Sequence, residues 1–284
     1  MTADALFHTK QFIYIVRHGV AEHNVKQLNN GIYANPNLLD PKYTDARLLP
    51  RGHLQAREVG KVIQSIILQK HRQPPHCHAI NAIISSPLTR CLQTASEIAQ
   101  KINFQGRWIV REELREAHGV HFSDKRSRRS ELEHSWSHAD FRCITEQDQD
   151  WKSDQRETVQ DVNKRIDSFL EWLSWNELVQ SNAQTSILNT VDDCTRTTST
   201  TSASPTANQS EDPSASPNTC LVISHGIWME LFLKKYFPKI MEGGKRVYNC
   251  NVFKATLECQ WENRGSAWNC RQIKISHVDL IRCE

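Results

Sequence analysis

The sequence predicts a three-layer α/β sandwich, in which helices cover both faces of a mostly parallel central sheet. Apolar runs without charged side chains and with many β-branched residues occupy 12–16, 79–85 and 220–224, which is typical of buried strands. Segments with apolar residues at helical spacing alternate with these runs, at 52–69 and 159–173. Strands and helices that alternate along a chain favour a layered fold with parallel strands joined by helices.

The remaining elements continue this alternation. Their expected order is a helix at 87–101, a short strand at 108–110, a helix at 227–235 and two strands at 252–261 and 268–276. The last two strands flank a polar stretch with a glycine, which is typical of a hairpin turn.

Basic side chains follow the three apolar runs where each strand ends. Arg17 and His18 come directly after the first run, and His225 comes directly after the third. Arg90 follows the second run, about one turn into a helix for which Ser86 is the expected N-cap. Because ligands bind at the carboxyl ends of parallel strands in such sheets, we expect these side chains to converge at one sheet edge.

A cluster of two arginines and two histidines at helix starts is suited to an anion. Arginine matches phosphate oxygens with two parallel hydrogen bonds, and the N–H groups at helix N-termini attract the same oxygens. Histidine can also act as a covalent nucleophile. We therefore expect a phosphate site, with the polar and irregular residues 118–150 as a lid over it.

Three motifs occur in a characteristic order: Arg-His-Gly at 17–19 with an asparagine at 24, Ser-Ser-Pro-Leu-Thr-Arg at 85–90, and Ser-His-Gly at 224–226. Together they resemble the histidine phosphatase superfamily, also called phosphoglycerate-mutase-like. The resemblance is colinear over residues 10–178 and 218–260. It implies the phosphoglycerate-mutase-like version of the layered α/β fold.

The resemblance implies a role for each matching residue. His18 would be the nucleophile that becomes phosphohistidine. Arg17, Arg90 and His225 would bind the phosphoryl oxygens, His225 as an imidazolium, and Asn24 would support the pocket. Neither a metal ion nor another cofactor is expected, because the arginines supply positive charge for the transferred phosphoryl group.

The leaving oxygen also needs a proton donor. The sequence Leu114-Arg115-Glu116 resembles the Leu-x-Glu signature of the family, which implies that Glu116 is the acid. Glu112 and Glu113 are neighbouring alternatives, although a solvated acidic turn is the favoured interpretation for both. A carboxyl group can serve as the acid if burial raises its pKa.

The expected function is a metal-independent phosphomonoesterase for a small phosphorylated molecule. Residues 119–126 and 148–158 resemble fungal and plant phosphoglycerate-mutase-like proteins of uncertain substrate, in which cysteine usually stands at the position of Ser123. A mutase is the nearest alternative, but its Glu-Arg-His-Tyr-Gly loop is not matched at 116–119. A non-catalytic scaffold that binds a phosphorylated ligand is an alternative from another class.

Composition limits the partners. The chain has 284 residues and a formal net charge of +3, which is too small to indicate nucleic-acid binding. No stretch is long and apolar enough to suggest a membrane span. The sequence shows no signal peptide and nine scattered cysteines, so a reduced, cytoplasmic setting is expected. The oligomeric state and the natural substrate are left open.

Three polar segments remain. The basic cluster at 125–129 is expected to face solvent, with attraction of anionic substrate and a nuclear address as alternatives. The histidines and cysteine at 71–78 match no standard zinc spacing. Residues 181–218 are rich in serine and threonine and too poor in apolar residues to offset the entropy of ordering. We expect them to be a disordered insert in a single domain that spans 1–284.

Overall fold

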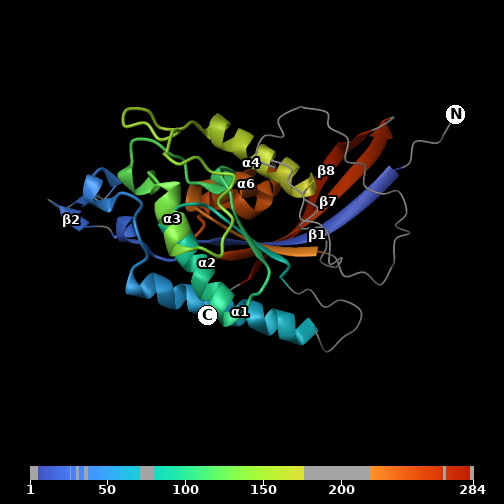
Figure 1. Ribbon diagram of the computed structural model, residues 1–284, viewed down its shortest axis with the longest axis horizontal. Helices are drawn as coiled ribbons and strands as arrows, with labels where there is room; N and C mark the ends of the chain where they lie inside the picture. Colours follow the sequence, from blue (N-terminus) through green and yellow to red (C-terminus); the bar gives the residue numbers. More distant parts are fainter. Residues whose placement is uncertain are drawn as a thin grey trace.

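Figure 1 shows the computed structural model of the chain. The structure describes residues 6–25, 27–29, 32–34, 38–70, 80–175, 218–264 and 267–281. Two predictions therefore lie outside the described residues: the insert at 181–218, apart from its last residue, and the ligand-type side chains at 71–78. In the described part of the chain, no helix combines the length and apolar character needed to cross a bilayer.

The core of the fold is a six-stranded mixed sheet with the strand order β5-β4-β6-β1-β7-β8. Its strands are β1 (Leu6–Arg17), β4 (Ala82–Ser85), β5 (Arg107–Val110), β6 (Asn218–Ser224), β7 (Val252–Arg264) and β8 (Ala267–Ile281). The first four strands of this order are parallel, and β7 and β8 are antiparallel. The predicted mostly parallel α/β sheet is thus confirmed.

Helices cover both faces of the sheet (Figure 1). They are α1 (Pro50–Lys70) and α2 (Thr89–Lys101) on one face, and α4 (Val159–Trp175) and α6 (Gly226–Tyr236) on the other. Side chains of β1 alternate between the two layers, because successive residues of a strand point to opposite faces. Tyr14 and Val16 belong to the core beneath α1 and α2, whereas Ile13 and Ile15 belong to the core beneath α4 and α6.

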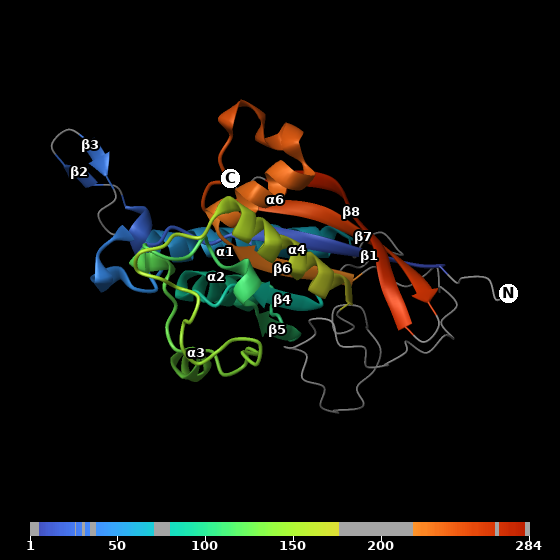
Figure 2. The same cartoon turned by 90° about the horizontal axis from the view of Figure 1, so that it is seen from above.

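Two smaller strands lie apart from the main sheet. The strands β2 (Gln27–Asn29) and β3 (Ile32–Ala34) form an antiparallel pair. Figure 2 shows this pair at one end of the molecule, while β1, β7 and β8 extend toward the other end.

The parallel register brings the predicted strand ends together. Arg17 is paired with Ser224 between β1 and β6, and Ser85 is paired with Ile223 between β4 and β6. The backbone N–H of His18 donates to the Ser224 carbonyl at 3.1 Å. The residues that follow β1, β4 and β6 therefore start from the same edge of the sheet.

The helix after β4 begins later than predicted. Its first residue is Thr89, so neither Ser86 nor Pro87 belongs to it. The carboxylate of Asp45 accepts a hydrogen bond from the Thr89 N–H at 2.8 Å. It thus caps the start of the helix, which was the role expected of Ser86. Asp45 is distant in sequence from the helix, so the residues around the helix start could not reveal this cap. The Ser86 hydroxyl accepts from the Leu88 N–H at 3.3 Å instead.

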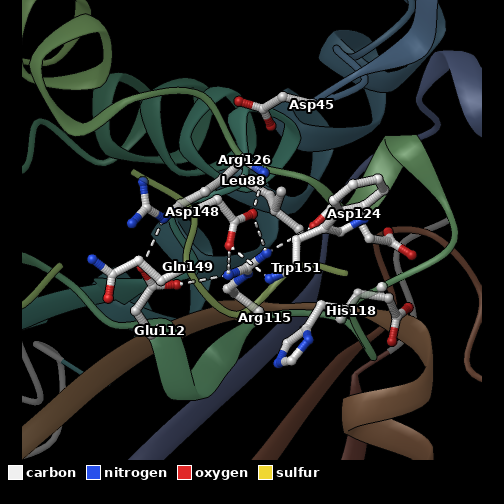
Figure 3. A network of polar contacts seen from close by, with 12 residues as sticks. Asp45, Leu88, Glu112, Arg115, His118, Asp124, Arg126, Asp148, Gln149 and Trp151 are labelled. Atoms are coloured by element: carbon white, nitrogen blue, oxygen red, sulfur yellow. Dashed lines mark hydrogen bonds and ion pairs between the residues drawn. The ribbon is translucent and has the colours of Figure 1, made fainter. Parts of the chain in front are cut away.

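The predicted lid is more ordered than its sequence suggested. It contains a 3₁₀ turn at Phe122–Asp124 and a helix, α3 (Arg129–Ser135). Figure 3 shows the ion pairs that fasten this segment. Arg115 pairs with Asp148 at 2.7 Å, and Arg126 pairs with Glu112 at 2.7 Å.

The basic cluster at 125–129 does not behave as a uniform solvent-facing patch. Arg126 is only 3% exposed, and its guanidinium also donates to the backbone carbonyls of Thr145 and Gln147. The prediction was therefore wrong for Arg126. It holds for Arg128, which is exposed.

Candidate active site

Four predicted residues from three strand ends meet at the carboxyl edge of the sheet. The ring centroids of His18 and His225 are 5.1 Å apart. The Nε of Arg90 lies 3.3 Å from the Nε2 of His18. Arg17 approaches from β1, and a Cβ atom at Gly226 would lie 3.1 Å from its Cζ. Glycine at 226 thus leaves room for the Arg17 guanidinium beside the start of α6.

His18 is held in one tautomer by its own neighbour. Its Nδ1 donates to the carbonyl of Gly19 at 2.7 Å, so the neutral ring has its lone pair on Nε2. The side chain is 1% exposed. Burial, followed by the charges of Arg90 and Arg17, lowers the pKa of His18 well below its usual value. The neutral, nucleophilic form of the imidazole is therefore favoured.

Arg17 has a donor left for an anion. One terminal nitrogen donates to the backbone carbonyl of Val247. Its Nε is buried and finds no hydrogen-bond acceptor among the described residues. A buried donor without an acceptor is costly unless a ligand or water satisfies it. An oxyanion bound beside His18 would supply such an acceptor.

Arg90 is completely buried, and the lid segment holds both of its terminal nitrogens. Nη1 donates to the carbonyl of Ser123 at 2.5 Å, and Nη2 donates to the carboxylate of Asp124 at 2.8 Å. Only Nε is directed toward His18. The guanidinium is thus fixed before any substrate binds.

His225 stands at the N-terminus of α6 and is also completely buried. Its Nε2 lies 2.8 Å from the hydroxyl of Ser86 and 3.3 Å from the sulfur of Cys91. Burial and the charge of Arg90 lower its pKa well below the usual value. The surroundings therefore favour the neutral ring over the expected imidazolium, and a phosphate dianion would shift this balance toward the charged form.

Glu116 has the environment expected of a proton donor. Its two oxygens accept from the backbone N–H of Ala117 at 3.0 Å and of Ile227 at 3.3 Å. Burial, followed by the negative charge of Asp124, raises its pKa, while Arg90 and the two N–H groups act in the opposite direction. The bond to Ile227 places this carboxyl beside the first turn of α6, next to His225.

The two alternative acids are engaged in structural ion pairs. Glu112 pairs with Arg126 at 2.7 Å and with Arg115 at 3.2 Å. Glu113 pairs with Arg111. Both are partly buried, so the predicted solvated acidic turn does not describe them. Because both carboxylates are paired with arginines that hold the lid segment or the residues just before it, Glu116 is favoured as the acid.

Asn24 contacts the site through a neighbour. Its Nδ2 lies 3.0 Å from the Nε2 of His23, and its Oδ1 accepts from the N–H of Ala21 at 3.0 Å. The His23 ring is 8% exposed, and its centroid is 5.6 Å from that of His18. Asn249 donates to both the His18 carbonyl and Asn24 Oδ1. Asn24 is therefore placed to support the wall of the site.

Sequence reasoning missed or undervalued three contacts. From the sequence alone, His23 is as readily a polar loop residue as a substrate contact, yet its ring packs beside the ring of His18. Ser86 contacts His225, although its local pattern suggested only a cap. Asp124 pairs with Arg90, and the only sequence signal was its position shortly after the Glu116 motif.

Comparisons with known proteins concern the family and the fold of the chain. A family model described as histidine phosphatase superfamily (branch 1) matches residues 13–188, which is more than half of the chain. A curated relative, phosphoglycerate mutase-like protein 1 of Arabidopsis thaliana, is 30% identical over 194 residues. That match covers 58% of this chain and 64% of the relative, so the chain spans less than two thirds of the relative's length.

Two solved structures share the fold at low sequence identity. Mycobacterial hydrolase 1 superposes with a TM-score of 0.50 and 14% identity, over 94% of this chain and 96% of its own. A phosphoglycerate mutase from Bacillus anthracis has the same TM-score and identity, over 93% and 92% of the two chains. With the ordered motifs, the sheet topology and the family match, these findings identify the chain as a member of the histidine phosphatase superfamily, branch 1.

Proposed function

We propose that this protein is a metal-independent phosphomonoesterase that acts on a small phosphate ester through a phosphohistidine intermediate. The observation that supports it best is the state of His18. Its Nδ1 donates to Gly19, so the Nε2 lone pair is on the side of the phosphate site, where it accepts from the Nε of Arg90 at 3.3 Å until a phosphoryl group takes that place. The buried Nε of Arg17, which has no acceptor among the residues that the structure describes, adds a second donor for phosphoryl oxygens. Arginine donors of this kind stabilise the charge of a transferred phosphoryl group.

The proposed reaction has two steps. In the first, Nε2 of His18 forms a bond to phosphorus as the bond from phosphorus to the ester oxygen breaks. Protonated Glu116 gives its proton to that oxygen, and the alcohol leaves. In the second, water attacks the phosphorus and loses a proton to the Glu116 carboxylate. The phosphorus–nitrogen bond breaks, which releases phosphate and restores both residues.

The intermediate can be tested directly. We expect brief exposure to p-nitrophenyl phosphate, followed by alkaline quenching, to give a phosphorylated enzyme with the label on His18 by mass spectrometry. His18→Ala should lower turnover by about 10⁴-fold or more, because the nucleophile is lost. His134→Ala, which changes an exposed histidine of α3, is the matched control and should retain activity. Turnover by the wild type with no label on His18 would contradict the mechanism.

A mutase is the second candidate, because the Arabidopsis relative is named phosphoglycerate mutase-like. The same site could return the phosphoryl group to another hydroxyl of the substrate. Glu116-Ala117-His118-Gly119 lacks the arginine and tyrosine expected in the mutase loop, which favours hydrolysis. Incubation with 3-phosphoglycerate separates the two: a phosphatase releases inorganic phosphate, whereas a mutase forms 2-phosphoglycerate. A protein that only binds phosphorylated ligands would do neither.

A further inference from the structure

Asp124 connects the lid segment to the phosphate site. It ends the 3₁₀ turn Phe122–Asp124 and is only 3% exposed. One carboxylate oxygen accepts from Arg90 Nη2 at 2.8 Å, and the other accepts from Arg156 Nη1 at 2.9 Å. His121 Nδ1 lies 3.6 Å from the second oxygen. A buried carboxylate is thus compensated by two guanidinium groups, one of which faces the nucleophile.

This arrangement fixes the direction of Arg90. A guanidinium is planar and rigid, so holding its two terminal nitrogens also sets where Nε points. Ser123 and Asp124 hold those nitrogens, and the Nε then faces His18 Nε2 at 3.3 Å. Arg156 in turn secures Asp124, since the same Nη1 also donates to the Gly119 carbonyl at 2.9 Å.

We propose that Asp124 is a positioning residue of the active site, which holds the Arg90 guanidinium with its Nε directed at His18. This inference rests on the proposed phosphatase function and adds a residue to it. Asp124 does not touch the reacting atoms in this scheme; it acts through Arg90. The lid segment is therefore part of the catalytic arrangement as well as a cover.

Asp148 is a carboxylate of the same segment with a purely structural role, and it can be compared with Asp124. Its side chain is also buried and pairs with an arginine, Arg115, at 2.7 Å. The hydrogen bonds of Arg115 go to Asp148, to Glu112 and to the backbone carbonyl of Asp124. Figure 3 shows this pair beside Asp124. The two aspartates thus have similar burial and partners, but only Asp124 pairs with an arginine that reaches His18.

The charge of Asp124 has a second effect, on the proton donor. After burial, it is the next largest influence that raises the pKa of Glu116. Arg90 and the N–H groups of Ile227 and Ala117 act in the opposite direction, and Arg17 also interacts with Glu116. Burial alone would raise the pKa of Asp124 too. The hydrogen bond from His121 and the charges of Arg90, Arg156 and His23 outweigh it and lower that pKa well below its usual range. Asp124 therefore stays ionised at neutral pH.

Asp124→Asn tests both effects, because it keeps the shape and removes the charge. We expect kcat to fall about 10- to 100-fold for p-nitrophenyl phosphate and for glycerol 3-phosphate, with a smaller change in KM, because a misplaced Arg90 weakens transition-state binding. The Glu116 pKa should also fall. The alkaline limb of kcat/KM should then move to lower pH for glycerol 3-phosphate, whose alkoxide needs a proton. It should stay in place for p-nitrophenyl phosphate, whose phenolate leaves without one.

Asp148→Asn is the matched control. It should lower the midpoint of thermal unfolding and leave kcat and the alkaline limb unchanged. If Asp124→Asn does not fold, Arg156→Gln replaces it, because that side chain is 27% exposed and supports Asp124 from the far side. This variant should lower kcat several-fold for both esters. A folded Asp124→Asn with wild-type kcat and pH profile, or equal changes in Asp148→Asn, would overturn the inference.

Binding of orthovanadate, which imitates the transferred phosphoryl group, separates this inference from the proposed function. It requires no turnover, and we expect Asp124→Asn to weaken it about tenfold. Weaker vanadate binding by the variant, with no hydrolysis by the wild type, would reject the phosphatase and keep the positioning role. Hydrolysis by the wild type, with unchanged binding and kcat in the variant, would do the opposite.

Discussion

The pKa values of His18 and Glu116 are shifted in opposite directions from their usual values. Burial, aided by Arg90 and Arg17, lowers the pKa of His18 well below its ordinary 6.5. Burial, aided by Asp124, raises the pKa of Glu116 above its ordinary 4.5. The proposed reaction needs a neutral imidazole and a protonated carboxyl at the same pH. These opposite shifts widen the pH range over which both forms coexist.

A bell-shaped pH dependence of kcat/KM is expected for hydrolysis of an alkyl phosphate. Activity should be lost as pH falls through the lowered pKa of His18, because the imidazole becomes protonated. It should also be lost as pH rises through the raised pKa of Glu116, because the acid is then ionised. The first limb should lie below pH 6.5 and the second above pH 4.5. Steady-state rates, corrected for the second ionisation of the ester near pH 6, measure both limbs.

Glu116→Gln identifies the source of the alkaline limb. This variant should lose most of its activity toward alkyl phosphates, by about 10²- to 10⁴-fold, and retain more toward p-nitrophenyl phosphate. What activity remains should no longer fall at high pH through this group. An alkaline limb that persists unchanged in Glu116→Gln would assign it to another residue.

The residues that the sequence could predict are those whose backbone position is set locally. Arg17 ends a strand and His18 and His225 directly follow strands, so a correct strand prediction already places them at one sheet edge. His23 and Asp124 could not be placed in this way. Their neighbours come from folded loops, and the 5.6 Å separation of the His23 and His18 rings depends on tertiary packing. Likewise, the lowered pKa of His225 reflects burial and the charges of other elements, which a local motif does not contain.

At the scale of elements, buried charges hold the lid segment in place together with its apolar side chains Leu132, Phe141 and Ile144. Arg115 is 1% exposed and Arg126 is 3% exposed, and each pairs with a carboxylate. Arg126 also donates to carbonyls at Thr145 and Gln147, so it joins the two ends of the loop around α3. Removing one partner of a buried pair leaves the other charge uncompensated, which is strongly destabilising.

Arg126→Met should therefore destabilise the protein by about 3–5 kcal/mol, because Glu112 and the loop carbonyls lose their donor. Urea unfolding measures the change in the free energy of unfolding. Arg128→Met is the matched control from the same basic cluster, and its exposed side chain predicts a change within about 0.5 kcal/mol. Equal effects of the two substitutions would show that the pairs of Arg126 contribute little.

Element boundaries were predictable where the apolar pattern alone decides them. The long helix predicted at 159–173 is observed as α4, Val159–Trp175, and the two C-terminal strands are observed as β7 and β8. The start of α2 was not predictable from local signals. Asp45 from a distant loop caps it at Thr89, so the Ser-Pro pair at 86–87 lies in the turn before the helix.

At the scale of the whole molecule, the sheet separates the edge at which His18 and His225 lie from the edge at which β6 begins. Asn218 begins β6 and is paired with Gln11 of β1, whereas Ser224 at the other end is paired with Arg17. Gln11 also contacts the carbonyl of Leu173 near the end of α4. The two described ends of the connection, α4 and β6, thus lie together at the amino edge of the parallel strands. The 7 residues of β6 separate this edge from His225 by roughly 20 Å.

Deletion of residues 190–216 should therefore leave phosphatase activity within a few-fold of the full chain. The expected reason is geometric: the shortened connection still joins α4 to the amino end of β6, and the residues around His18 are attached to the opposite edge. The measurement is kcat/KM for p-nitrophenyl phosphate, with thermal unfolding of both proteins as the control for folding. A deletion variant that unfolds like the full chain but has lost its activity would show that the deleted residues act at the catalytic edge, and the separation of the two edges would then not describe how this chain works.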